Sequence, residues 1–210
     1  MTTLIKRMLY LLCVVLIVSG AIMLFSGIGD CTKIVSTEPL DINDVDSSKF
    51  HDGILVSGDI YYVIDSVATS YSTELFSNSK IIYYLVPIKS GKYVLVATGN
   101  TNEINTLDRI FQQTCQYLNQ EIEDTFTSLN IDGKVFPLDD ELKDFLYSWA
   151  ETTNYFSTTD QSLIDEEVLP YVIHTQSWKN IKVITAVGLI TMLLGIIGFI
   201  IVHKKLIVKG

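Results

Sequence analysis

Two long apolar runs stand out in the hydrophobic pattern of the chain. The second, Val183 to Val202, contains twenty residues without a charge and is followed by His203 and two lysines. As a helix, at about 1.5 Å per residue, it is about 30 Å long, the thickness of the hydrocarbon core of a bilayer. The first run, Met8 to Gly29, follows Lys6 and Arg7. We therefore predict transmembrane helices over residues 8–29 and 179–202, the latter with its outer flank.

Between these runs the chain has strand-like and helix-like segments. Alternating β-branched and aromatic residues predict strands at 54–56, 60–64, 80–88, 92–98 and 167–174, with a turn or bulge at Ser57-Gly58-Asp59. The loop Lys89-Ser90-Gly91 should join two of them as an antiparallel hairpin. Helical spacing predicts amphipathic helices from residue 101 to about 126 and from 138 to 149. A short turn element is expected around Asp132-Gly133.

These segments predict the α+β class, with an extracytoplasmic antiparallel sheet of about five strands and two amphipathic helices against one face. The domain should span residues 53–178. Residues 30–52 are polar and acidic and predict a tether. The stretch does not match the pattern of a calcium-binding loop, because Val45 and Asp46 occupy the positions where that pattern needs an oxygen ligand and a glycine.

The charges predict how the chain lies in the membrane. All 24 Asp and Glu residues fall between Asp30 and Glu167, whereas five Lys and Arg residues lie at the outer ends of the apolar runs. Basic residues near transmembrane ends stay in the cytoplasm, so residues 1–7 and 203–210 should be cytoplasmic and 30–182 extracytoplasmic. Lys179 and Lys182 weaken this orientation without reversing it. The acidic outer segment argues against nucleic-acid binding.

Small residues recur in both apolar runs at spacings that matter in lipid. Gly188, Thr191, Gly195 and Gly198 share one helix face, and Cys13, Gly20 and Gly27 repeat every seven residues in the first run. These faces would let the helices dock on each other or on a partner. The alternative is that glycine is simply common in membrane helices.

The cysteines leave two questions open. Cys31 and Cys115 both fall in the predicted outer segment, where a possible disulfide is chemically allowed. Cys115 also lies on the apolar side of its helix, so a buried free thiol is the alternative.

The first apolar run is too long for a typical signal peptide, which favours an uncleaved anchor. Asp30 before Cys31 fits a lipoprotein signal poorly.

Motifs for chemistry are missing from the sequence. It contains no HExxH, CxxC, GxSxG, P-loop or GxGxxG pattern, so we assign no catalytic, metal or cofactor-binding residues. An enzyme is the less favoured class. It would need Asp59, Asp65 or His174 to converge through folding.

One resemblance covers nearly the whole chain. The stretch DGILVSGDIYYVIDSVAT, the hairpin YYLVPIKSGKYVLVAT and the two flanking apolar helices resemble an uncharacterised family of two-pass membrane proteins of Gram-positive bacteria, a domain of unknown function. The resemblance implies a bacterial host and no site residues.

Two functions follow as hypotheses. The first is a two-pass protein of the cell membrane with an extracytoplasmic binding or interaction domain, an accessory or sensing component of a membrane complex. Its partners would be the lipid bilayer and a membrane protein, or a second copy, reached through the transmembrane helices. The second is a membrane-anchored enzyme of the cell envelope.

Overall fold

The computed structural model describes all residues except 1–2, 44–46, 75–76, 125–126, 177 and 208–210. The chain divides into two compact units, a helical unit of residues 1–37 and 177–210 and a sheet domain, Glu38–Gln176.

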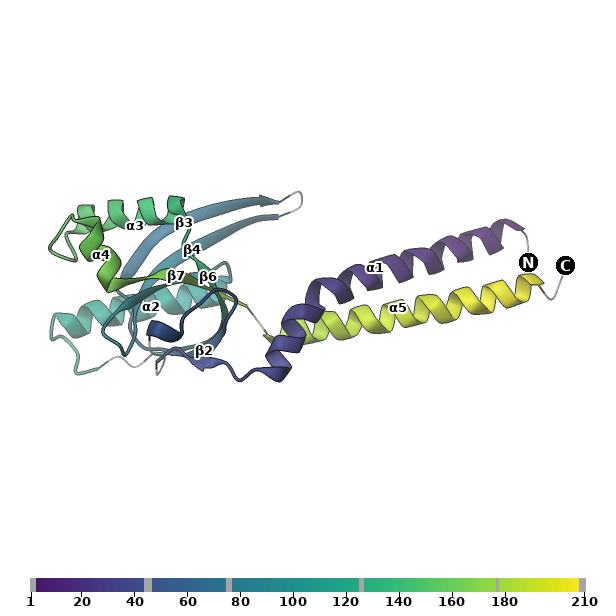
Figure 1. Cartoon of the computed structure of the whole chain (residues 1–210), viewed down its shortest axis with the longest axis horizontal. Coiled ribbons are helices and arrows are strands. Elements are labelled where there is room, and N and C mark those ends of the chain that lie inside the picture. Colours follow the sequence, from purple (N-terminus) through teal and green to yellow (C-terminus); the bar gives the residue numbers. More distant parts are fainter. Residues whose placement is uncertain (1–2, 44–46, 75–76, 125–126, 177, 208–210) are drawn as a thin grey trace. The chain divides into compact units, whose positions relative to one another are not determined.

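The helical unit consists of α1 (Thr3–Ser36) and α5 (Trp178–Ile207), which lie side by side along their length (Figure 1). Both helices are long and apolar enough to cross a membrane. With 34 and 30 residues they are about 51 and 45 Å long, so each exceeds the thickness of the hydrocarbon core. The first helix continues beyond residue 29 into the stretch for which the sequence predicts a tether.

Glycines bring the two helix backbones together. A Cβ atom at Gly20 would lie 2.5 Å from the backbone nitrogen of Met192, and one at Gly188 would lie 2.7 Å from that of Leu24. Real Cβ atoms do not approach other atoms below 3.0 Å. Only a hydrogen in place of the side chain therefore permits this contact.

Aromatic side chains join the same helices near the end of α5. The hydroxyl oxygen of Tyr10 lies 2.7 Å from Nδ1 of His203. The rings of Tyr10 and Phe199 meet edge to face with their centroids 4.9 Å apart. This contact adds a polar link to the close packing of the two helices.

In the residues that the structure describes, the sheet domain contains seven strands, three helices and a short 3-10 helix. In chain order these are β1 (Leu40–Asp41), the 3-10 helix η1 (Ser47–Lys49), β2 (Leu55–Ile60), β3 (Asp65–Glu74), β4 (Ser77–Pro87), β5 (Tyr93–Thr98), α2 (Thr101–Leu118), β6 (Leu129–Pro137), α3 (Asp140–Thr153), α4 (Gln161–Glu167) and β7 (Val168–Thr175). The sheet order is β1-β2-β6-β7-β5-β4-β3. The β1–β2 and β5–β7 pairs are parallel, and the others are antiparallel.

Both faces of the sheet are buried. Successive side chains of a strand point to opposite faces, so Tyr84 and Val86 of β4 pack with α2 while Leu85 packs with α3 and α4. Tyr84 is 1% exposed, and its hydroxyl donates to Asp108 of α2 at 2.7 Å. Figure 1 shows α2 and α3 on different sides of the strands, so the prediction that both helices lie against one face was wrong.

The α+β class is confirmed, and the sheet is larger than expected. It has seven strands of mixed direction rather than about five antiparallel ones. Strands β1, β3 and β6 add to it, while the predicted strands 54–56 and 60–64 are one strand, β2, and residues 61–64 form the connection after it. The predicted hairpin is β4 and β5, with Pro87 at the strand end. Ile42 and Phe50, from the predicted tether, are buried in the core on the α2 face.

Three local predictions were wrong. Residues 129–137 form the inner strand β6, in which Gly133 leaves room for Ile173 of β7; a Cβ there would lie 2.5 Å from its Cγ2. The predicted break at Gly58 lies within β2, whose register with β6 is regular. The helix from residue 101 ends at Leu118 rather than near 126, because Gln120 has a φ of 60°, which is not helical.

The glycine contacts predict opposite effects for two alanine substitutions in α1. Gly20→Ala should destabilise the helix pair by about 1–3 kcal/mol, because the methyl group meets the backbone of α5. Gly29→Ala is the control. Apart from its two chain neighbours and the adjacent backbone of its own helix, no described atom lies within 4 Å of its Cβ position, so only the gain in helix propensity, about 1 kcal/mol, remains.

To measure this, the helix pair is unfolded with SDS, and the loss of energy transfer between labels at Met8 and Lys204 reports the unfolding. Equal or greater stability of Gly20→Ala relative to Gly29→Ala would contradict the close packing.

Candidate functional site

A cleft of about 370 Å³ is the best candidate site of the sheet domain. Three separate segments form it: the chain after β1, the end of β2 with the connection that follows, and the end of β4 with its turn. We call it the β2–β4 cleft. Its lining residues are Ile42, Asn43, Asp59, Ile60, Tyr61, Tyr62, Val86, Pro87, Ile88 and Lys89.

The floor of the β2–β4 cleft is apolar. Ile42, Ile60, Val86 and Ile88 line it and belong to the core on the α2 face, where each is at most 6% exposed. Tyr61 is 46% exposed. An apolar hollow with a few polar groups is the usual form of a small-molecule site.

A short hydrogen-bond network fixes the polar side of the cleft. Asn43 donates from its side chain to the backbone oxygen of Asp59 at 2.9 Å and from its backbone to Oδ1 of Asp41 at 2.8 Å. Asn130 of β6 donates to Oδ1 of Asp59 at 3.2 Å. Gly58 makes this approach possible, because a Cβ there would lie 2.7 Å from Asp41 Oδ1. The Asp59 carboxylate is therefore held in place on the lining.

Tyr62 connects the cleft to the end of α2. Its hydroxyl donates to Oδ1 of Asp124 at 3.1 Å, and its ring lies 5.8 Å from that of Tyr117. This contact fixes the connection between β2 and β3, which forms one side of the cleft.

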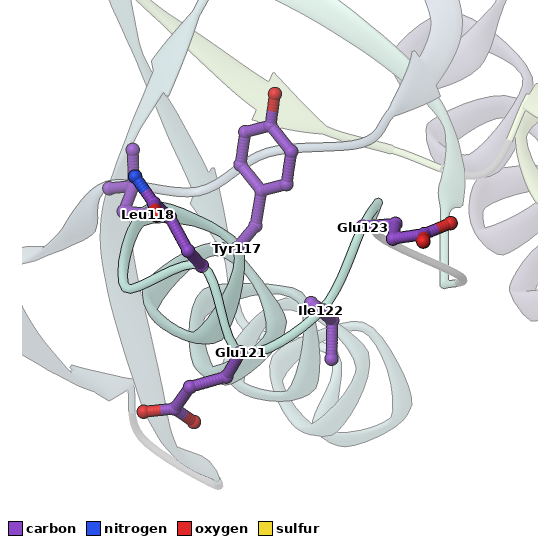
Figure 2. Close-up of a pocket in the computed structure, with 6 residues that line it drawn as sticks. Tyr117, Leu118, Glu121, Ile122 and Glu123 are labelled. Atoms are coloured by element: carbon purple, nitrogen blue, oxygen red, sulfur yellow. The ribbon is translucent and has the colours of Figure 1, made fainter.

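A larger hollow of about 580 Å³ lies beside the turn after α2. It is lined by residues 117–118 and 120–123, which belong to one short stretch of the chain, and is open to solvent. Figure 2 shows that Glu121 and Glu123 point away from each other and that Ile122 projects from the same loop. These side chains do not converge on a common point, so the hollow is a weaker candidate than the β2–β4 cleft.

The residues of the enzyme hypothesis do not share a site. Asp59 is opposite Asn130 on β6, while His174 is opposite Lys134, four residues further along the same strand. At about 3.3 Å per residue this separates them by about 13 Å along β6 alone. Asp65 lies at the start of β3, at the far edge of the sheet order, where it accepts from the indole nitrogen of Trp149 at 2.9 Å.

His174 is a packed histidine between aromatic rings. Its ring meets those of Phe136 and Tyr83 edge to face, with centroids 5.2 and 6.2 Å away. Burial lowers the pKa of His174, and the charge of Asp139 opposes this in part. The neutral imidazole is therefore the form that the fold favours.

The structure contains no bond between the sulfur atoms of Cys13, Cys31 and Cys115. Cys31 lies in α1 and Cys115 in α2, in different units of the chain, so their disulfide stays a prediction. Burial, and secondarily the charge of Asp65, raise the pKa of the Cys115 thiol, which keeps it protonated and poorly reactive. Among the residues that the structure describes, no group of three His, Cys, Asp or Glu side chains is placed to hold a metal ion.

The predicted small-residue faces lie in the contact between α1 and α5. Gly188 and Gly195 are buried, and Thr191 and Gly198 are half-buried on the same side of α5. A Cβ at Gly195 would lie 2.9 Å from the backbone nitrogen of Ile17, and one at Gly198 would lie 3.0 Å from Cys13 Sγ. The faces therefore pack on each other within one chain.

The chain matches one family of proteins. A model described as a domain of unknown function, DUF8577, matches residues 2–203. A search of curated proteins found no match. The match includes most of both apolar helices and the whole sheet domain.

The lowered pKa of His174 predicts loss of stability in acid. Below about pH 6.5 this histidine binds a proton in the unfolded chain, whereas in the folded chain it stays neutral to a lower pH. The free energy of unfolding therefore falls as the pH falls. His174→Gln should remove this part of the dependence. The melting temperature between about pH 7.5 and pH 5 should fall a few degrees less for the variant than for the wild type.

His51→Gln is the matched control, because His51 is exposed. It should follow the wild-type profile. Parallel profiles for wild type and His174→Gln would show that burial of His174 has no effect on its titration.

Proposed function

The chain belongs to the DUF8577 family, whose description names no activity, and we propose that it is a two-pass protein of the cell membrane with an extracytoplasmic binding domain. In this proposal α1 and α5 form the membrane anchor, and the β2–β4 cleft takes the ligand. The protein would act as an accessory or sensing component of a membrane complex.

The observation that carries the proposal is the exposure of two apolar helices. Only 11% and 17% of the residues in their most apolar windows are buried. Apolar side chains such as Leu11, Phe25 and Leu194 are at least 60% exposed. A helix in the core of a soluble protein would be covered on several sides, whereas this pair needs an apolar solvent. The hydrocarbon core of a bilayer supplies one.

Charge supports the orientation. Residues 38–176 contain 23 Asp and Glu against seven Lys and Arg, a net charge of -16. The basic residues Lys6, Arg7, Lys204 and Lys205 flank the apolar stretches at the other ends. Basic flanks are usually retained in the cytoplasm, so this distribution of charge supports an acidic domain on the outer side of the membrane.

The packing also limits how a membrane partner would bind. The glycine faces of α1 and α5 are occupied by each other, so they are not open to another protein. The outer faces carry exposed side chains such as Leu12, Val15, Leu193 and Ile197. A partner would contact these aliphatic faces or the sheet domain, and lipid would cover the remainder.

Cysteine labelling tests this orientation. In a background with Cys13→Ala, Cys31→Ser and Cys115→Ser, single cysteines replace Ser90, which is exposed in the β4–β5 turn, or Lys204, which is exposed near the end of α5. A membrane-impermeant maleimide should label Ser90→Cys on intact bacterial cells. Lys204→Cys should react only after the cells are permeabilised.

The pair of variants controls for reactivity, because each thiol must label in permeabilised cells. Labelling of Lys204→Cys on intact cells, or protection of Ser90→Cys there, would overturn the orientation.

A further inference from the structure

The groups that line the β2–β4 cleft indicate the chemistry of its ligand. We propose that the cleft binds a small organic cation, in which an ammonium group is attached to a short apolar body. This inference rests on the proposed binding role of the cleft and adds the class of ligand.

The apolar body matches the floor of the cleft. The side chains of Ile42, Ile60, Val86 and Ile88 on the lining are aliphatic, and the ring of Pro87 is also apolar. The volume of about 370 Å³ suits a molecule of the size of an amino acid or a small aromatic amine. The floor contributes no hydrogen-bonding group from its side chains, so it has no means of pairing a charged or strongly polar part of a ligand.

The ammonium group matches Asp59. Oδ1 of Asp59 accepts from Asn130, and within the described part of the chain no donor is bound to Oδ2. Asp59 is half-buried, which strengthens its attraction for a cation relative to a fully solvated carboxylate. The network through Asn43 and Asn130 holds the backbone and side chain of Asp59 in place before a ligand arrives. A ligand that binds to an acceptor already held in place pays a smaller entropy cost for ordering that acceptor.

Two further features favour a cation over an anion. The ring of Tyr61, 46% exposed on the lining, offers a π face to an ammonium group. The net charge of -16 on the domain attracts cations to its surface and repels anions. Lys89 is the one basic residue among the described residues of the lining, and it takes part in an interaction of its own within the chain.

Three probes of matched shape test the proposal: benzylammonium, benzyl alcohol and benzoate. They differ in the charge of the head group on the same ring. The full chain in lipid nanodiscs is titrated with each, with empty nanodiscs as the blank. Binding is followed by the methyl signals of isoleucine, because Ile42, Ile60 and Ile88 report on the cleft itself.

Benzylammonium should shift these methyl signals and bind about tenfold more tightly than benzyl alcohol, with benzoate the weakest. Asp59→Asn should remove this preference for the ammonium, because the neutral amide still accepts from Asn130 but carries no charge. Asp52→Asn makes the same charge change at an exposed position outside the cleft and should keep the preference.

The outcomes separate the two proposals. Equal affinity for the three probes at the cleft, or tightest binding of benzoate, overturns cation selectivity while cleft binding stands. An absence of methyl shifts for all three up to about 10 mM overturns both. If the peptide acetyl-Gly-Lys-Gly-amide binds more tightly than benzylammonium, the ligand is a lysine side chain of a peptide, which contradicts the proposal of a small molecule.

Discussion

The close approach of α1 and α5 is the constraint on which the helical unit, the proposed membrane anchor, depends. In lipid, helices gain little from burying apolar side chains, because the surrounding acyl chains are equally apolar. Association must come from close packing, and close packing requires small residues at the contact. Gly20, Gly188 and Gly195 supply them, and each would clash with the facing backbone if it carried a side chain. The small-residue faces serve this pairing.

The sheet domain rests on a different constraint, the burial of both faces of its central strands. Tyr84 and Leu85 of β4 point into cores on opposite sides, under α2 and under α3 with α4. A sheet covered on both faces leaves its ligand sites to strand ends and connections. The β2–β4 cleft lies at such a place, where the chain leaves β2 and where β4 ends. The core residues of these strands form its floor.

Sequence periodicity predicted the elements in which the side chains on one face are all buried or all exposed to the same surroundings. The two apolar helices, the β4–β5 hairpin and the strand β7 are uniformly apolar or clearly alternating. The missed strands are different. β1 is only two residues long, β3 (DSVATSYSTE) is an edge strand rich in Ser and Thr, and β6 contains Asp132-Gly133, a pair typical of turns. In β6 the glycine serves the close contact with Ile173 instead. The cleft could not be predicted, because its segments are far apart in the chain and its residues form no motif.

A nitroxide scan of α5 in lipid tests the account most directly. Labels at Leu189, Leu193, Leu194 and Ile197, all at least 43% exposed on the helix pair, would face the acyl chains if α1 and α5 span the bilayer. Collisions with oxygen, which concentrates in lipid, should then be frequent, and collisions with a water-soluble nickel chelate rare. Frequent collisions with the nickel chelate at all four positions would show that these helices lie in water, which contradicts a membrane anchor.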